Sequence, residues 1–254
     1  MCLKVMLNEM SWVEAKKYFA ENDVAVFPVG SNEQHGPHNP LGTDHLIAQA
    51  LAQEAAKRTG VLCLPVVPFG VSSHHKQFWG TVFVSPDTFK RYVKDACLSL
   101  QYYGVKKIVV VNGHGGNLDT LKLLAREMRE IGVFVSVFQW WTAAAELLPD
   151  LFKSGERSHA CAEETAVNLA LHPNLVTMKD AADEVLKDYS FENSGISLPF
   201  DIVDYVSSGV LGKSSTASAR KGKEVFRAVV DELVEHINAL KKARVKDLVQ
   251  KPKV

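Results

Sequence analysis

The chain has 254 residues, of which 46% are hydrophobic and 23% are charged, and its 29 basic and 29 acidic side chains leave a formal net charge of zero. This length and composition are typical of a soluble globular protein that buries a full core. The balanced charge does not favour a nucleic-acid or membrane partner, because such partners usually select a basic excess. No apolar run reaches the ~18–20 residues needed to span a bilayer.

In chain order, the sequence predicts a helix at 11–22, a strand at 24–27, a helix at 45–58, a strand at 61–67, a helix at 85–103, a strand at 107–111, a helix at 117–131, a strand at 133–138, and helices at 158–171 and 219–243. Ser11 with Glu14 is a capping-box signature, and Ser85 with Pro86 supplies an N-cap and a first-turn proline. Asp44 is a candidate cap for the second helix.

The alternation of strands and helices predicts an α/β fold with a mainly parallel sheet and helices on both faces. The alternation weakens after residue 158. We expect residues 180–218 to form loops with short elements, and the basic tail at 241–254 to be frayed. The sequence shows no internal repeat, and we predict a single domain over residues 1–254.

The four cysteines are widely separated and form no CxxC pair: Cys2, Cys63, Cys97 and Cys161. This pattern predicts reduced thiols in a cytoplasmic protein rather than a disulfide framework. The N-terminus has no long apolar segment followed by a small-residue cleavage site, so we expect no signal peptide.

The densest group of metal-binding side chains lies in the loop after the first strand, at residues 28–45. It holds Glu33, His35, His38, Asp44 and His45. In open α/β sheets, ligands bind beyond the carboxyl ends of the strands. A core strand that ends in a loop rich in carboxylates and imidazoles therefore indicates a site.

Two further segments supply the same chemistry. His114 follows the third strand, and His159, Glu163 and Glu164 lie near the start of a later helix. Convergence of imidazole and carboxylate ligands from separate segments predicts a metal site that suits Zn, Mn or Fe(II). A bridging carboxylate could hold two ions about 3.5–4 Å apart.

The glycine-rich sequence NGHGGN at 112–117 has a second interpretation. Glycines between a strand and a helix can hold a phosphate at the helix N-terminus. The spacing is neither GxGxxG nor GxxxxGK[ST], so a nucleotide site is the weaker hypothesis. In the alternative, the glycines let the backbone pass close to a metal and its substrate.

Three motifs together resemble the creatininase family of metal-dependent amidohydrolases: GSNEQHGPHNPLGTD at 30–44, NGHGGN at 112–117 and the segment 159–164. The segment HHKQFWGT at 74–81 extends the resemblance. It implies a three-layer α/β/α fold, two divalent metal ions per subunit and a homo-oligomer, commonly a hexamer built as a trimer of dimers.

The resemblance also implies a set of metal ligands. Glu33 would bind one ion and His35 the other, Asp44 would bridge them, and His114 would complete the shell of the first ion. In creatininase proper a glutamate two residues after this last histidine binds the second ion, and here that position is Gly116.

Glu164 is the best replacement for the missing glutamate, and His159 matches the proton-transferring histidine of the family. We assign both to catalysis and predict that the helix begins after His159, so that the two side chains can reach one site. Gly115 stands where the family has a tyrosine. The two glycines argue against creatinine as the substrate.

We predict that His75, Gly115, Trp140 and Trp141 contact a small-molecule substrate. Packing at a sheet edge or a subunit contact is an equally weighted role for the two tryptophans. A phosphorylated substrate would require a cation such as Lys76.

Other side chains of the same motifs receive structural roles. We assign such roles to His38 and His45, and we expect Glu163 to be solvated.

The predicted activity is hydrolysis of a cyclic amide or formamide C–N bond in a small molecule, other than a peptide bond. Deformylation of a formylaminopyrimidine nucleotide and peptide cleavage in mycofactocin maturation are alternatives within the family. A catalytically silent, oligomeric small-molecule-binding protein is the alternative outside enzymology.

Overall fold

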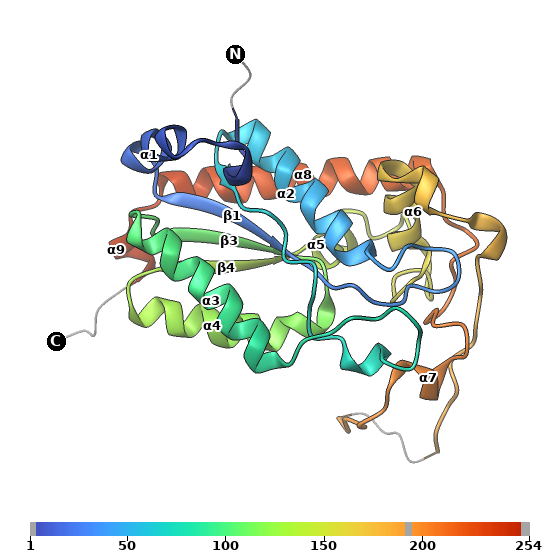
Figure 1. Cartoon of the computed structure of the whole chain (residues 1–254). Coiled ribbons are helices and arrows are strands. Elements are labelled where there is room, and N and C mark those ends of the chain that lie inside the picture. The colour runs from blue at the N-terminus through green and yellow to red at the C-terminus, as the bar shows by residue number, and fades with distance from the viewer. Residues whose placement is uncertain (1–3, 191–194, 250–254) are drawn as a thin grey trace.

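The computed structural model of the protein describes residues 4–190 and 195–249 (Figure 1). Its centre is a four-stranded sheet with the order β2-β1-β3-β4, in which every pairing is parallel. The strands are β1 (Val24–Val29), β2 (Leu62–Cys63), β3 (Lys107–Asn112) and β4 (Phe134–Gln139). The prediction of an α/β fold with a parallel sheet is confirmed.

The second strand is much shorter than the predicted range 61–67. Pro65 interrupts it because proline has no backbone N–H to donate to a neighbouring strand. Pairing resumes only as an isolated bridge between Val67 and Val29.

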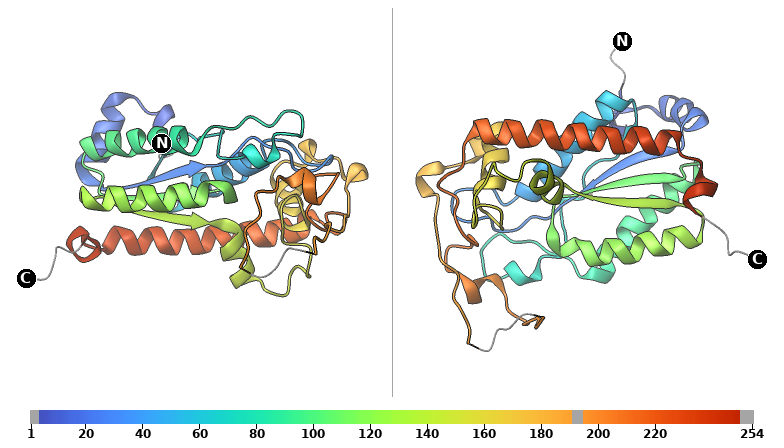
Figure 2. Two further views of the ribbon diagram at one scale, coloured as in Figure 1. Left: turned by 90° about the horizontal axis from the view of Figure 1, so that it is seen from below. Right: turned by 180° about the vertical axis from the view of Figure 1, so that it is seen from behind.

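Helices cover both faces of the sheet, as Figures 1 and 2 show. Alternate residues of β1 divide between two cores, with Val24 and Val26 in one and Ala25 and Phe27 in the other. The first core is closed by α2 (Thr43–Thr59), α5 (Trp140–Leu147), α6 (Ala162–Leu171) and α8 (Ala219–Lys242). The second is closed by α3 (Pro86–Tyr102) and α4 (Leu118–Glu130). These layers form the predicted α/β/α sandwich.

The helix starts follow local capping chemistry. Ser11 caps α1 (Trp12–Glu21) in the predicted capping box with Glu14. Ser85 caps α3 ahead of Pro86. The predicted cap at Asp44 is wrong, because α2 begins at Thr43 with Gly42 as its N-cap residue. The carboxylate of Asp44 lies in the first turn and is free to serve a site.

Two helix boundaries near the predicted site differ from the sequence-based ranges. Helix α5 was not predicted and follows β4 directly. Helix α6 begins at Ala162 instead of residue 158, because Ala160 adopts a left-handed φ of 58° that a helix cannot contain. The prediction that His159 precedes the helix is therefore confirmed.

Residues 181–190 and 195–218 belong to a long arm whose described part holds one short helix, α7 (Ile202–Tyr205), in agreement with the prediction for this region (Figure 1). Two carboxylates fold it back on itself. Glu184 accepts hydrogen bonds from the backbone N–H groups of Ser207 and Ser208, and Asp183 accepts from Ser214 and Ser215.

The tail is more ordered than predicted up to residue 249. It contains α9 (Val245–Leu248), and the Arg129 guanidinium donates to the carbonyl of Leu248. The rest of the predicted frayed tail, residues 250–254, lies outside the described residues. Short 3-10 helices complete the fold at Leu7–Glu9, Ser73–His75, Gly115–Asn117, Pro173–Leu175 and Met178–Asp180.

Two global predictions can be compared with the described residues. Cys63, Cys97 and Cys161 are buried free thiols, as expected, and Cys2 lies outside the described part of the chain. No helix among residues 4–190 and 195–249 has both the length and the apolar content to cross a membrane.

Helix α8 approaches α6 closely at Gly222, where an added Cβ would lie 1.8 Å from the carbonyl oxygen of Ala166. A Gly→Ala change inside a helix normally stabilises it by about 1 kcal/mol. Here we expect Gly222→Ala to lower the free energy of unfolding by about 1–3 kcal/mol through overpacking. Denaturant unfolding would measure the change.

The neighbouring exposed residue Lys223 provides a matched control in the same turn of α8. Lys223→Ala should unfold within about 0.5 kcal/mol of the wild type. A Gly222→Ala protein at least as stable as the wild type would contradict the close helix contact.

Candidate metal centre

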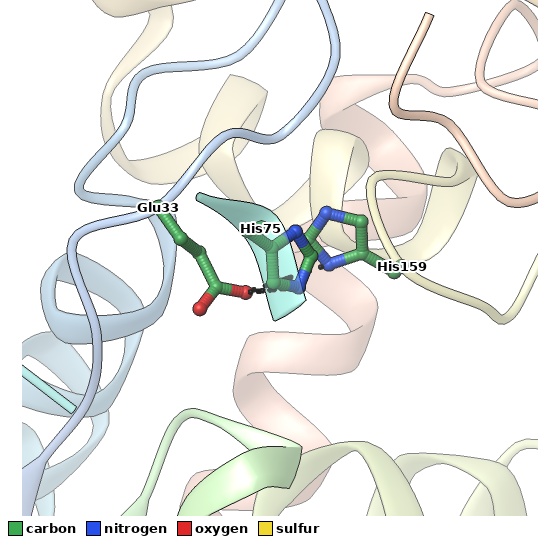
Figure 3. Close-up of side chains that lie close together, drawn as sticks. All are labelled: Glu33, His75 and His159. Atoms are coloured by element: carbon green, nitrogen blue, oxygen red, sulfur yellow. Dashed lines mark ion pairs between the residues drawn. The ribbon is translucent and has the colours of Figure 1, made fainter. Parts of the chain in front are cut away.

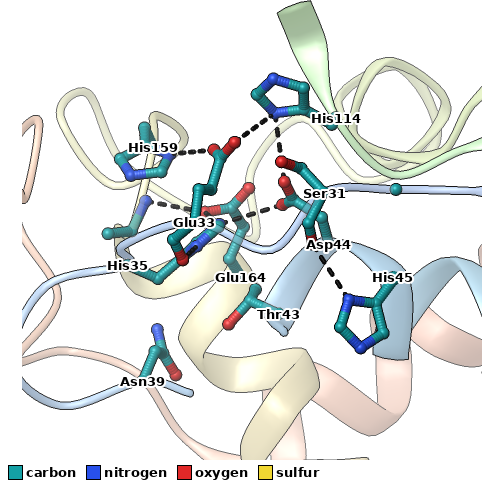
Figure 4. Close-up of polar contacts among 12 residues, drawn as sticks. Ser31, Glu33, His35, Asn39, Thr43, Asp44, His45, His114, His159 and Glu164 are labelled. Carbon is teal, nitrogen blue, oxygen red and sulfur yellow. Dashed lines mark hydrogen bonds and ion pairs between the residues drawn. The ribbon is translucent and has the colours of Figure 1, made fainter. Parts of the chain in front are cut away.

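The predicted metal ligands meet at the carboxyl end of the sheet (Figure 4). Glu33 and His35 lie in the loop after β1, Asp44 in the first turn of α2, and His114 just beyond β3. Each of these four side chains is at least 95% buried. The convergence that the sequence predicted from separate segments is therefore present in the structure.

Asp44 lies at the middle of the cluster. Its Oδ1 is 3.0 Å from Nε2 of His35, and its Oδ2 is 3.1 Å from Nδ1 of His114. The same nitrogen of His114 is 3.1 Å from Oε2 of Glu33. One carboxylate thus faces two imidazoles with its two separate oxygens, which is the geometry of a bridging ligand.

Several of these buried atoms lack a hydrogen-bond partner, although charged neighbours lie within 4 Å. They are both carboxylate oxygens of Glu33, Nε2 of His35 and Oδ2 of Asp44. Buried polar atoms of a folded protein are normally satisfied. Ligand atoms of Glu33, His35 and Asp44 lie within 4.8 Å of one another, as donors to one shared ion would. This arrangement fits a metal ion.

The imidazoles are held as metal-binding histidines usually are. Nδ1 of His35 lies 3.2 Å from the carbonyl oxygen of Glu33, and Nε2 of His114 lies 3.0 Å from that of Val71. Each carbonyl can accept only from a protonated nitrogen, so the other nitrogen keeps its lone pair for the centre. The hydrogen-bond network therefore assigns the ligand tautomer to both rings.

A second group of ligand atoms adjoins the first. Oε2 of Glu164 lies 3.7 Å from Nε2 of His35, and the two residues form a possible metal group with His159. The backbone N–H of Ala160 donates to the same carboxylate oxygen at 2.7 Å. The left-handed turn before α6 thus places Glu164 on the His35 side of the cluster.

The charges of the cluster shift its pKa values in opposite directions. Burial raises the pKa of Glu33, and it raises that of Glu164 to about 7. Burial would also raise the pKa of Asp44, but the imidazoles of His35 and His114 hold it well below its ordinary value. Asp44 is therefore the carboxylate that stays ionised.

The imidazoles respond to the same carboxylates. Burial would lower the pKa of His35, but Asp44, Glu164 and Glu33 raise it to about 10. Burial would likewise lower the pKa of His114, but Glu33 and Asp44 raise it well above its ordinary value. The cluster thus attracts positive charge, either as protons on the imidazoles or as a cation that replaces them.

A cavity of about 310 Å³ opens onto this cluster. Gly115, His75 and Trp141 line it, together with the apolar side chains of Ile202 and Leu211 from the arm. A cavity of this volume suits a small molecule. Three of the four predicted substrate contacts therefore border the same cavity.

These features agree with the comparisons with known proteins. The family model described as creatinine amidohydrolase matches residues 8–237. The chain belongs to the creatininase family.

Individual members of the family show the same relationship. The chain is 28% identical to creatinine amidohydrolase of Pseudomonas putida, over 93% of this chain and 97% of that protein. It is 30% identical to the mycofactocin precursor peptide peptidase of Mycobacterium ulcerans, over 84% and 83% of the two chains. A crystal structure of creatininase superposes with a TM-score of 0.79 at 28% identity, over 94% of this chain and 99% of that one.

One predicted substrate contact is wrong. Trp140 is 1% exposed, packs in the core with α2 and α8, and does not line the cavity. Because α5 begins directly at Trp140, successive side chains point about 100° apart. The rings of Trp140 and Trp141 are accordingly perpendicular, and only Trp141 faces the cavity.

The expectation that Glu163 is solvated is also wrong. The residue is 3% exposed and forms an ion pair with the Arg157 guanidinium in the cavity wall. Burial raises the pKa of Glu163 to about 7, against the opposing effect of Arg157. The sequence offered no signal for this pair, since Arg157 belongs to no periodic or motif pattern.

The remaining candidates lie outside the cluster. His38 contacts Thr165 through Nε2 at 2.8 Å, and Nδ1 of His45 is 3.0 Å from the carbonyl oxygen of Ser31. Lys76 pairs with Asp201 at 3.0 Å and does not line the cavity. Both histidines contact neighbouring loops and helices, and Lys76 forms a surface ion pair.

The motif also contains a side chain that the sequence analysis did not single out. The amide nitrogen of Gln34 lies 2.9 Å from Nδ1 of His75 and 2.8 Å from Nε2 of His159. His75 in turn places Nε2 3.3 Å from Oε1 of Glu33 (Figure 3). The available signal was the position of Gln34 between two candidate ligands.

Gly116 has no room for a side chain. An added Cβ would lie 2.2 Å from the Val71 carbonyl oxygen and 2.5 Å from Nε2 of His114. The glutamate expected here from creatininase is therefore incompatible with this backbone, which instead brings the Val71 carbonyl to His114.

The adjacent glycine provides a controlled test of this packing. We expect Gly116→Ala to displace either Val71 or His114, and so to reduce the metal content of protein dialysed against divalent ions. An added Cβ at Gly115 meets nothing within 4 Å, so Gly115→Ala should keep the wild-type metal content. Elemental analysis of both variants would measure the difference, and equal metal content would refute the role of the close contact.

Proposed function

We propose that this protein is a metal-dependent hydrolase that cleaves the C–N bond of a cyclic amide or formamide in a small molecule. The observation that carries this proposal is the convergence of Glu33, His35, Asp44 and His114 with unpartnered buried ligand atoms, in a member of the creatininase family. The catalytically silent alternative predicts a missing ligand, and all four are present.

The geometry supports two ion positions. Glu33 and His114 would hold one ion, His35 and Glu164 the other, and Asp44 would lie between them with one oxygen toward each imidazole. The donor set of imidazole and carboxylate suits Zn, Mn or Fe(II). Such ions lower the pKa of water and polarise a carbonyl group.

His159 is the proposed proton carrier. Its Nε2 lies 2.9 Å from the backbone carbonyl of Gln34, and its Nδ1 lies 3.7 Å from Oε1 of Glu33 (Figure 4). Donation from Nε2 to the carbonyl leaves Nδ1 bare and directed to the centre. Burial, with His35 and His75, lowers the pKa of His159 well below its ordinary value. The ring is thus ready to accept a proton and pass it to the leaving nitrogen.

The cavity favours an uncharged substrate. Among the described residues, Arg157 is the only lysine or arginine that lines it, and Glu163 pairs with that charge. Trp141, Ile202 and Leu211 add apolar surface. A phosphate group would find no unpaired cation in the part of this wall that the structure describes, so a small amide fits better than a formylaminopyrimidine nucleotide.

Three broader predictions complete the proposal. A cytoplasmic location would keep the buried cysteines reduced. A homo-hexamer follows from the family resemblance, and so does the single domain over residues 1–254.

The substrate class can be tested by a hydrolysis screen of cyclic amides and formamides, with Zn, Mn and Fe(II) supplied in turn. We expect turnover of at least one such compound and its loss in chelator-treated protein. Creatinine should be turned over more slowly than the ~1 s⁻¹ at the lower end of typical enzymes, because Gly115 and Gly116 lack the side chains found in creatininase. Rapid creatinine turnover would contradict this assignment.

The roles of Glu164 and His159 can be separated by metal content and activity. Glu164→Gln should lose one of the two proposed ions, whereas Glu163→Gln, which alters the adjacent carboxylate paired with Arg157, should keep both. His159→Asn should keep both ions and lose about 10²–10⁴-fold in turnover, as expected for a missing general acid–base. Full metal content in Glu164→Gln would remove Glu164 from the ligand set.

A further inference from the structure

The four imidazoles around the centre are not held alike. In His35, His114 and His159, the ring nitrogen that points away from the centre faces a backbone carbonyl oxygen. The nitrogen-to-oxygen distances are 3.2, 3.0 and 2.9 Å, in that order. Behind His75, the remote nitrogen faces the side-chain amide nitrogen of Gln34 at 2.9 Å. A carbonyl requires a proton on the remote nitrogen, whereas an amide N–H requires a lone pair there.

Two backbone groups fix the orientation of the Gln34 side-chain amide, because a backbone N–H can only donate and a backbone carbonyl can only accept. Its oxygen accepts from the backbone N–H of Gly36 at 2.9 Å, and its nitrogen donates to the carbonyl of Gly209 at 3.1 Å. The reversed amide would set a donor against a donor and an acceptor against an acceptor. The group that faces His75 is therefore an N–H.

The amide nitrogen has two protons and three neighbours, which are Gly209, His75 and His159. If the protons go to the Gly209 carbonyl and to His75, then His159 can donate its own proton to the backbone carbonyl of Gln34, and only the 2.8 Å contact between the Gln34 amide nitrogen and Nε2 of His159 carries no hydrogen bond. If one proton goes to His159, its Nε2 must be bare, and the carbonyl of Gln34 then loses its donor among the described residues. Because buried polar groups are normally paired, the first arrangement is favoured, since it leaves both backbone carbonyls with a donor.

We propose that Gln34 is a positioning residue that fixes the proton of His75 on Nε2, so that His75 donates a hydrogen bond to Glu33 instead of binding metal. This inference rests on the proposed metal centre and adds a function for a residue outside its ligand set. Nε2 of His75 lies 3.3 Å from Oε1 of Glu33, an oxygen with no hydrogen-bond partner among the described residues, so a proton on Nε2 would face this oxygen at ion-pair distance (Figure 3).

The consequence concerns the number of metal positions. Glu33, His75 and His159 have ligand atoms within 4.8 Å of one another and could form a metal group of their own. With a proton on Nε2, His75 cannot join it. Gln34 thereby leaves His159 free as a proton carrier and keeps the Glu33 carboxylate oriented by a donor, as in the outer shell of other metal sites.

The proton position can be read directly by NMR of Zn-loaded protein labelled with [15N]histidine. Long-range 1H–15N correlations distinguish the two neutral tautomers, and the His75 signals are identified by their loss in His75→Gln. We expect His75 of the wild type to be protonated on Nε2 and bare on Nδ1. A proton on Nδ1 in the wild type would overturn the proposal, whatever the variants do.

Gln34→Glu tests the cause, because a carboxylate in place of the amide can only accept from His75. The His75 proton should move to Nδ1, and turnover of any substrate found should fall about 10- to 100-fold, as for other outer-shell changes. Should this variant fail to fold, Gln34→Met removes the amide without adding charge, and the single Nε2–H form should be lost. An unchanged His75 pattern in either folded variant would contradict the proposal.

The matched control is Asn39→Asp, which alters another buried amide of the same loop. Asn39 contacts His38 and Thr165 and does not contact His75 or His159. The His75 signals of the Asn39→Asp variant should match those of the wild type. Because the tautomer is measured without turnover, failure of the hydrolysis screen would count against the proposed function and leave this inference standing.

Discussion

The whole centre depends on how closely the first turn of α2 approaches the ends of β1 and β3. A Cβ at Gly30 would lie 2.5 Å from the Cα of His45, and one at Gly113 would lie 2.2 Å from the carbonyl oxygen of Asp44. Only glycine at both strand ends allows this approach. It places Asp44 between His35 and His114, and the remaining ligands are arranged around that carboxylate. The glycines of the motifs are therefore as necessary to the site as its charged residues.

Burial makes this cluster costly unless positive charge is held at its centre. Glu33 and Asp44 are almost completely buried within the same small volume, and an isolated buried carboxylate is strongly destabilising. Carbonyls of Glu33 and Val71 fix His35 and His114 with their lone pairs facing inward. The backbone thus supplies the geometry for a cation, and without one the buried carboxylates destabilise this part of the fold.

The sequence predicted the parts of the structure that depend on local pattern. The parallel order of strands and helices and the helix caps at Ser11 and Ser85 followed from periodicity and spacing. The short second strand has a local cause at Pro65, whereas the misses at the site depend on three-dimensional contacts. Whether Trp140 or Trp141 faces the cavity depends on where α5 starts, and the burial of Glu163 depends on Arg157. Likewise, Gln34 becomes important only because His75 and His159, from distant segments, meet its amide.

The departure at Gly116 links the proposed metal ligands to the proposed proton carrier. With no side chain possible at that position, the proposed second ion draws its carboxylate from Glu164 on α6. That carboxylate is held by the N–H of Ala160, and the left-handed conformation of Ala160 also ends the segment that carries His159. A non-glycine residue in this conformation is strained and persists only where its surroundings enforce it. One strained turn therefore positions both the proposed ligand Glu164 and the proposed proton carrier His159, so that under this proposal a shift of the turn would change metal binding and proton transfer together.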